Sequence, residues 1–97
     1  MNEQQIWECI AAVLIEEQKK PFGWWYTSFV NGVFLGGCIV EAQGPATALR
    51  QTHKLGINPG GETMTWEIVP DRVPPETYRN RLLTKAQIVE AFPGLAV

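Results

Sequence analysis

The sequence predicts a single α+β domain in which helices pack against a three-stranded antiparallel sheet. Two apolar, β-prone segments flank the Asn31-Gly32 pair, and this arrangement is the strongest short-range signal for a β-hairpin. A helix-like segment and a third strand-like segment follow, which favours a helix lying over a sheet. The expected order along residues 1–97 is therefore α-β-β-α-β-α. Residues 1–70 are expected to form the core and residues 71–97 a C-terminal helical extension.

Composition excludes several functional classes. The 97 residues carry a net charge of -2, whereas a general DNA or RNA binder would show a basic stripe. No apolar segment approaches the roughly 18 to 20 residues that span a bilayer, and no signal peptide is evident. Cys9 and Cys38 lack metal-site spacing and only one His is present, so we expect no metal and two buried free thiols. These features together favour a cytoplasmic protein.

The first helix is expected from about Glu3 to Lys19. Asn2 is a suitable N-cap residue, and Pro21 with Gly23 ends the helix. Ile15 is expected on the exposed side, where a partner or a second copy could touch. The buried stripe has helical spacing and comprises Ile6, Trp7, Ile10, Val13 and Leu14.

The predicted hairpin covers Trp24 to Ala42. Alternate residues of a strand face opposite sides, and aromatic residues occupy both sides of the first strand. We therefore expect this strand to be central and covered on both faces. Gly36 and Gly37 in the second strand are typical of a bulge or a slot for a neighbouring aromatic ring. The alternative is a flat floor on which a ligand could lie.

A second helix is predicted from Pro45 to Leu55, with Gly56 as its left-handed cap. Its expected buried stripe comprises Ala48, Leu49, Thr52 and Leu55. A tight turn at Asn58-Pro59-Gly60-Gly61 should lead into a third strand, Glu62 to Val69, which buries Met64, Trp66 and Ile68. If this strand pairs with the first, the sheet has the order 2-1-3.

The C-terminal part contains two helix-start signals. Thr84 and Gln87 form a capping box, and Leu83 with Ile88 forms a hydrophobic staple. They predict a helix that ends at Phe92, preceded by a short helix within 76–82. Whether the last helix docks on the sheet or on a partner stays open.

Four motifs occur in order: Trp24-Trp25-Tyr26-Thr27-Ser28-Phe29, Phe34-Leu35-Gly36-Gly37, Val40-Glu41-Ala42 and Gly56-Ile57-Asn58-Pro59-Gly60-Gly61-Glu62. Together they resemble a family of small uncharacterised proteins that are common in bacteria, phages and prophages. The resemblance covers about Trp24 to Pro70, and this chain adds the first helix and the tail. It implies a shared fold core and a phage-like context, and it transfers no catalytic residue.

Catalytic chemistry is not expected. Ser28, His53 and either Glu41 or Glu62 supply the residue types of a hydrolase triad, but no nucleophile elbow or oxyanion loop accompanies them. We therefore expect no enzyme activity, no catalytic residue and no cofactor.

Recognition of a ligand is the leading hypothesis: a phage or prophage counter-defence protein that sequesters a nucleotide-like signalling molecule. Aromatic side chains would stack on the base, and basic side chains with the glycine turn would meet phosphate. The alternative for the aromatic residues is burial under the helices, and for the turn a purely structural role. The candidate ligand-binding residues are Trp24, Trp25, Tyr26, Arg50, His53, Asn58, Gly60 and Gly61.

Two other hypotheses remain. The first is an adaptor or inhibitor that binds a host protein through the C-terminal helix, with Arg79, Arg81 and Lys85 facing an acidic partner. The second is a structural accessory protein without a ligand, whose sheet mediates self-association. A homo-oligomer is expected, and a membrane partner is not.

Overall fold

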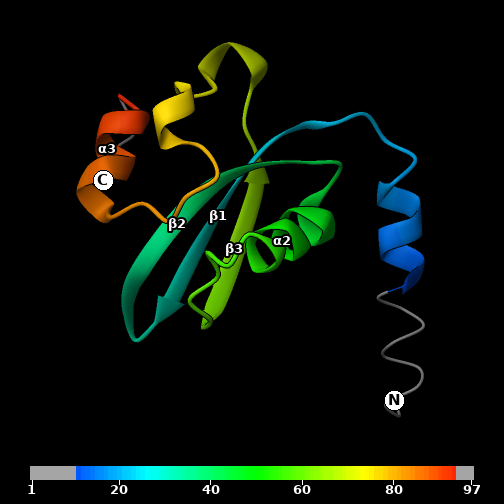
Figure 1. Ribbon diagram of the computed structural model, residues 1–97, viewed down its shortest axis with the longest axis horizontal. Coiled ribbons are helices and arrows are strands. Elements are labelled where there is room, and N and C mark those ends of the chain that lie inside the picture. Colours follow the sequence, from blue (N-terminus) through cyan, green and yellow to red (C-terminus); the bar gives the residue numbers. More distant parts are fainter. Residues whose placement is uncertain (1–10, 94–97) are drawn as a thin grey trace.

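The computed structural model describes residues 11–93 and has at its centre a three-stranded antiparallel sheet (Figure 1). Its strands are β1 (Gly23–Asn31), β2 (Val33–Ala42) and β3 (Glu62–Glu67), in the order β2-β1-β3. Helix α2 (Pro45–Lys54) connects β2 to β3. The expected α+β fold and strand order are therefore confirmed.

Two helical regions flank the chain's core. Residues 11–17 are helical, whereas Asn2, Ile6, Trp7 and Ile10 of the predicted first helix lie outside the described residues. After β3 come two single 3-10 turns, Pro70–Arg72 and Glu76–Tyr78, and then helix α3 (Lys85–Ala91). Figure 1 shows the N-terminal helical segment on one side of the molecule and α3 on the other.

The hairpin turn is tighter than the sequence predicts. Asn31 pairs with Val33, so Gly32 alone occupies the tip, with a φ of 76°. Further along, Phe29 pairs with Gly36 and Val30 with Phe34, which leaves Leu35 as the extra residue of a β-bulge. A bulge is one of the two features expected at the glycine pair.

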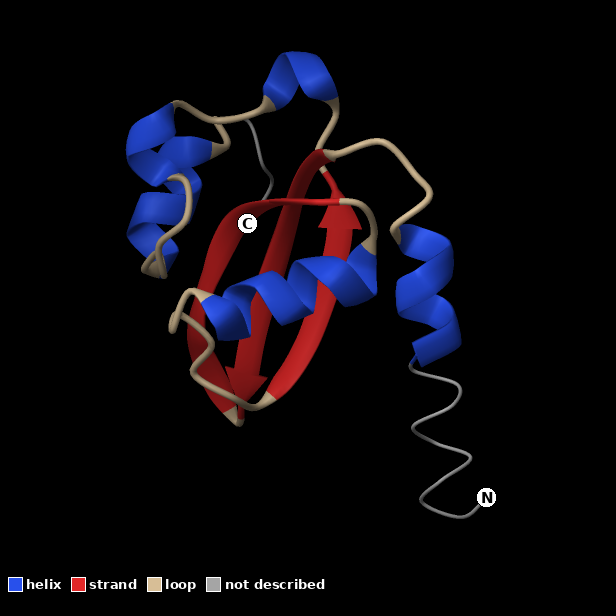
Figure 2. Ribbon diagram, turned by 45° about the vertical axis from the view of Figure 1, so that its right-hand side comes forward, coloured by secondary structure: helices blue, strands red, loops and turns tan. Residues whose placement is uncertain are grey.

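Strand β1 is covered on both faces, as predicted. Helix α2 crosses one face (Figure 2), where Val40 and Ala42 pack with Ala48. On the other face the C-terminal segment packs over the sheet. That larger cluster consists of Tyr26, Ile39, Ile68, Leu83, Ile88 and Ala91.

The glycine pair in β2 makes room for an aromatic ring and for another backbone. A Cβ on Gly37 would lie 2.6 Å from Oη of Tyr26, so that ring occupies the space. The Gly37 N–H donates to the Leu83 carbonyl at 3.1 Å, and the Leu83 N–H donates to the Gly37 carbonyl at 2.7 Å. These contacts cover the surface at Gly36 and Gly37, so a ligand cannot lie flat on it.

The C-terminal helix docks on the sheet. The capping box of Thr84 and Gln87 is present, and both members of the predicted staple, Leu83 and Ile88, are buried in the core. Residues after Pro70 therefore complete the apolar core. The short helix expected within 76–82 is reduced to the single turn Glu76–Tyr78.

Three predicted buried stripes need correction. Strand β3 ends at Glu67, and Met64 and Trp66 are 66% and 43% exposed because α3 packs over β2 and leaves this part of the sheet uncovered. Leu55 is also exposed, since α2 ends one residue before it. Val13 in the N-terminal helical segment is exposed as well.

Candidate ligand pocket beside helix α2

The aromatic residues expected to bind a ligand are separated by the sheet. Trp24 and Tyr26 face the C-terminal segment, whereas Trp25 faces α2. Tyr26 is only 4% exposed, and the two tryptophans are half-buried. The Trp25 indole donates to the Ala42 carbonyl at 3.2 Å, and the Arg79 guanidinium lies 4.6 Å from the Trp24 ring centroid. Most of the surface of Trp24, Trp25 and Tyr26 is therefore buried within the protein, which is the alternative to ligand binding.

The glycine turn lies at the opposite end of β1 from the tryptophans. Gly61 approaches the Val30 carbonyl so closely that a Cβ there would be 2.6 Å from its oxygen. Trp24 is six residues from Val30, or roughly 20 Å at about 3.3 Å per residue. One small ligand therefore cannot touch both places.

The Asn58 side chain is used within the turn itself. Its Oδ1 accepts from the Gly60 N–H at 2.8 Å, and its Nδ2 donates to Oγ1 of Thr52 at 3.3 Å. Gly60 and Gly61 have φ values of 86° and 84°, so both need the freedom of glycine. These bonds support the structural interpretation of the turn.

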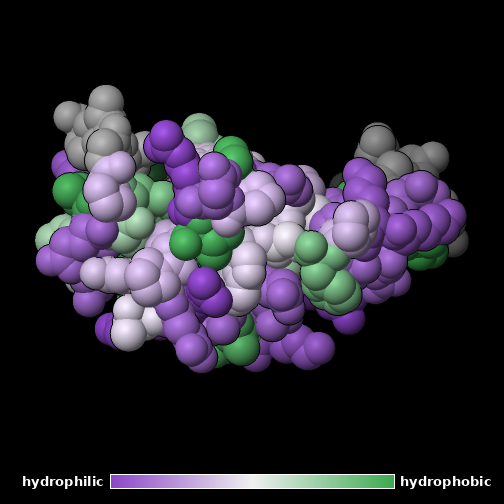
Figure 3. Space-filling view, turned by 90° about the horizontal axis from the view of Figure 1, so that it is seen from above, coloured by the Kyte–Doolittle hydropathy of each residue, from purple (hydrophilic) through white to green (hydrophobic). Residues whose placement is uncertain are grey.

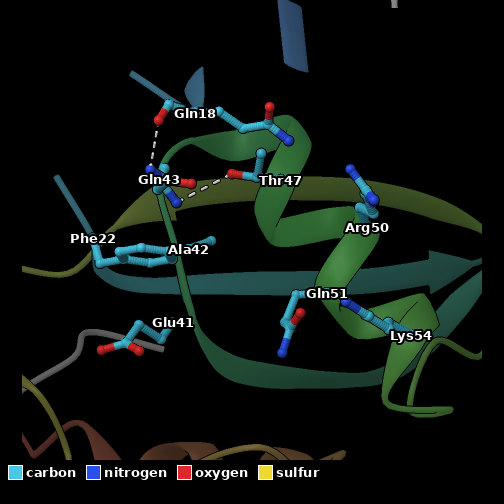
Figure 4. A pocket seen from close by; sticks show the side chains of 9 residues that line it. All are labelled: Gln18, Phe22, Glu41, Ala42, Gln43, Thr47, Arg50, Gln51 and Lys54. Atoms are coloured by element: carbon cyan, nitrogen blue, oxygen red, sulfur yellow. Dashed lines mark hydrogen bonds between the residues drawn. The ribbon is translucent and has the colours of Figure 1, made fainter. Parts of the chain in front are cut away.

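A surface pocket of about 180 Å³ lies between the N-terminal segment and α2 (Figure 4). Arg50 is the single predicted ligand residue that lines it; His53 is exposed elsewhere on α2. The pocket was not found from the sequence, because its walls come from three separate segments. Its lining residues are Gln18, Phe22, Glu41, Ala42, Gln43, Thr47, Arg50, Gln51 and Lys54.

One wall of the pocket carries two cations. Thr47, Arg50 and Lys54 are spaced at i, i+3 and i+7, which places them on one side of α2. Within residues 11–93 the single ion pair joins Lys19 to Glu16, so neither Arg50 nor Lys54 is neutralised by a described carboxylate. This wall can therefore offer charge to an anion.

The opposite wall is held in place by hydrogen bonds. The side-chain amide Nε2 of Gln43 donates to the carbonyls of Gln18 and Lys20 at 2.9 and 2.8 Å. Phe22 is 66% exposed, so its ring is free at the rim. Glu41 also lines the pocket, but it pairs with Trp24 and its carboxylate points away from Arg50 and Lys54 (Figure 4). The pocket thus combines cations, amides and an aromatic ring.

Glu17 ties the N-terminal segment to α2 and was missed by the sequence reasoning. Its carboxylate is 4% exposed and accepts from the N–H groups of Ala46 and Thr47 at 3.0 and 2.7 Å, and from Oγ1 of Thr47 at 2.9 Å. The N-cap residue Gly44 has no side chain to do this, and a Cβ there would collide with Glu17. The first N–H groups of a helix favour a negatively charged partner, but no local pattern links Glu17 to a helix that begins 28 residues later.

The residue types of a hydrolase triad do not assemble. Ser28 lies on the face of the sheet that carries Tyr26, whereas His53 belongs to α2 on the other face. Burial raises the pKa of the Cys38 thiol to about 12, so a thiolate nucleophile is not available there near neutral pH. Within residues 11–93, no group of three or more potential metal ligands is found.

Two of the three predicted partner-binding cations are engaged within the C-terminal segment. Nε of Arg79 donates to the Pro74 carbonyl at 2.8 Å, and Nη1 of Arg81 donates to the Thr77 carbonyl at 3.4 Å. Lys85 is exposed at the start of α3. These residues do not form a single cationic patch with Arg50.

Comparison with known proteins adds no family to this description. No family model, no curated protein and no solved structure matches the chain. None of the helices in the described part of the chain has the length and apolar character needed to cross a membrane.

Proposed function

We propose that the protein is a non-enzymatic binding protein that sequesters a small anionic, nucleotide-like molecule in the pocket beside α2. The observation that carries the proposal is the meeting of Arg50 and Lys54 with the exposed Phe22 ring around one pocket. Guanidinium and ammonium groups bind phosphate, and a free aromatic ring can stack on a base.

The remaining lining residues suit the polar edge of such a ligand. The side-chain amide of Gln51 can donate to or accept from a hydroxyl or an exocyclic amine. At about 180 Å³ the pocket is smaller than the roughly 300 Å³ at the lower end of drug-sized sites. A phosphate would therefore enter the pocket while the base lies across Phe22 at the rim.

The biological context of the proposal comes from the family resemblance. Its motifs resemble those of small bacterial and phage proteins, and a phage protein without catalytic residues is suited to removing a signalling molecule by binding it. We therefore propose a role in counter-defence, in which the protein binds and sequesters a nucleotide signal of the host.

A panel of cyclic and linear nucleotides in a thermal-shift experiment tests this function. A ligand that binds the folded state raises the melting temperature according to its concentration and affinity. We expect at least one nucleotide to stabilise the protein, and failure of every nucleotide at saturating concentration would remove the proposal.

A charge-matched pair of variants locates the site. Arg50→Ala with Lys54→Ala should weaken binding roughly ten- to hundredfold, because a charge-assisted hydrogen bond contributes about 1.5 to 3 kcal/mol. Arg72→Ala with Lys85→Ala removes the same charge from exposed positions outside the pocket and should retain the affinity. Equal losses in both variants would argue for non-specific attraction.

The adaptor hypothesis has less support. Ile88 and Ala91 of α3 are already buried against the sheet, Val89 is the one large apolar side chain that α3 leaves exposed, and Arg79 covers Trp24. A partner that binds this helix would meet mainly its polar side.

A further inference from the structure

The outer edge of β3 is free to accept another strand. β3 lies at one edge of the sheet, and within residues 11–93 no backbone group pairs with its outer side. Its pairing with β1 runs from Glu62 to Glu67 without a bulge. The strand also contains no proline and no lysine, which are common devices against edge pairing.

The direction of the free backbone groups follows from one hydrogen bond. The Ile68 N–H donates to the Trp24 carbonyl at 2.9 Å, so residue 68 points its backbone toward β1. Alternate residues of an antiparallel strand point the same way. The backbone groups of Thr63, Thr65 and Glu67 therefore point away from the sheet.

We propose that β3 pairs with β3 of a second copy of this chain, in antiparallel orientation about a two-fold axis at Thr65, to give a continuous six-stranded sheet. In this register Thr65 lies opposite Thr65 of the second copy, and Thr63 lies opposite Glu67. All three outward-pointing residues then find hydrogen-bond partners. This proposal does not depend on the proposed ligand.

Side chains are complementary in the same register. Met64 faces Trp66 of the second copy on the face that carries Tyr26, over the part of the sheet that α3 leaves uncovered, and this contact shields two exposed apolar residues. A methionine sulfur beside an aromatic ring is a favourable contact. Each Glu67 meets a threonine, so no like charges oppose one another across the edge.

The fold limits this pairing to two copies. The outer edge of β2 is occupied by Leu83, which exchanges two backbone hydrogen bonds with Gly37. Figure 1 shows the C-terminal segment beside β2, on the opposite side of the sheet from β3. With one free edge per chain, a two-fold pairing closes as a dimer and does not extend into a fibre.

The mass of the full chain in solution, measured by light scattering across a dilution series, tests the interface. We expect twice the chain mass at high concentration. Met64→Glu should give a monomer, whereas Val33→Glu should remain dimeric. Val33 is a matched control because it is 68% exposed at the hairpin tip and the same charge is added. A monomeric wild type, or equal behaviour of the two variants, would overturn the proposal.

A cysteine scan tests the register and does not depend on the folding of Met64→Glu. In a Cys9→Ser background, Thr65→Cys should form a disulfide-linked dimer under mild oxidation, since residue 65 faces itself across the axis. Thr63→Cys should not, because its neighbour in the second copy is Glu67. Efficient cross-linking of Thr63→Cys with none of Thr65→Cys would contradict the proposed register.

Discussion

The absence of a side chain at Gly37 allows β2 to pack against the Tyr26 ring. The Tyr26 ring fills the space beside Gly37 and also contacts Trp66 and Phe92, at ring-centroid distances of 4.6 and 5.6 Å. A methyl group at residue 37 would therefore push on the centre of the larger apolar cluster. Interiors packed this closely tolerate added volume poorly.

Gly37→Ala should reduce the free energy of unfolding by about 1 to 3 kcal/mol, the usual cost of overpacking. Gly23→Ala is the matched control, because the nearest atom to its new Cβ would be 3.8 Å away. Chemical denaturation of both variants measures the difference. Equal stability of the two variants would show that the ring has room to move.

Cys38 is expected to make the fold sensitive to alkali. Burial raises the pKa of its thiol from 9.0 to about 12, so the unfolded chain loses this proton first as the pH rises. Stability from this group is complete below pH 9 and is lost progressively toward pH 12. Tyr26, whose pKa rises to about 12 through burial and the nearby Cys38, adds a similar loss above pH 10.

The free energy of unfolding of wild type should therefore fall more steeply above pH 9 than that of Cys38→Ala. The comparison uses the slope against pH, so the cavity created by alanine does not affect it. Parallel curves for the two proteins would mean that the thiol titrates normally in the folded state.

At the scale of elements, the end of the N-terminal helical segment and the start of α2 form hydrogen bonds with each other. Glu17 bonds to the first N–H groups of α2, while Gln43 bonds to the carbonyls that end the N-terminal helical segment. Each segment thus satisfies backbone groups that the other leaves free. Gln18, Gln43 and Thr47, which take part in these contacts, also line the candidate pocket.

Glu17→Ala should cost about 2 kcal/mol of stability, since it removes a charged cap and three hydrogen bonds. Glu16→Ala is its control: Glu16 is exposed and forms a surface pair with Lys19, whose loss should cost less than about 0.5 kcal/mol. Denaturation curves for both variants give the comparison. A cost for Glu17→Ala as small as that of the control would contradict its role as the cap.

Local signals in the sequence predicted individual elements well. The Asn31-Gly32 pair marks the hairpin, Gly56 ends α2 with a φ of 71°, and Thr84 begins α3. Each of these devices acts through neighbouring residues. The exposure of Met64 and Trp66 depended instead on where the C-terminal segment packs, which no local pattern contains.

The candidate site was predicted only in part for the same reason. Residue types suited to a nucleotide were recognised, but the sheet separates Trp24 from Trp25 and the length of β1 separates both from Asn58. The pocket depends on contacts such as Glu17 with Thr47, thirty positions apart in the chain. Arg50 alone belongs to both the predicted set and the pocket.

At the scale of the whole molecule, few surfaces are left for recognition. Apart from the exposed Met64 and Trp66 on β3, the two faces of the sheet are covered by α2 and by the C-terminal segment. The view in Figure 3 is mainly hydrophilic, with small separate hydrophobic areas. The pocket beside α2 and the free edge of β3 lie at different places, so one copy could bind a ligand while paired with another.

The most direct test is a nuclear magnetic resonance titration of the labelled protein with a nucleotide selected by thermal shift. We predict that the side-chain amide signals of Gln43 and Gln51 move, while the indole signals of Trp24 and Trp25 and the Asn58 amide stay in place. Shifts confined to the indoles or to Asn58, with the pocket glutamines unchanged, would contradict ligand binding in the pocket beside α2.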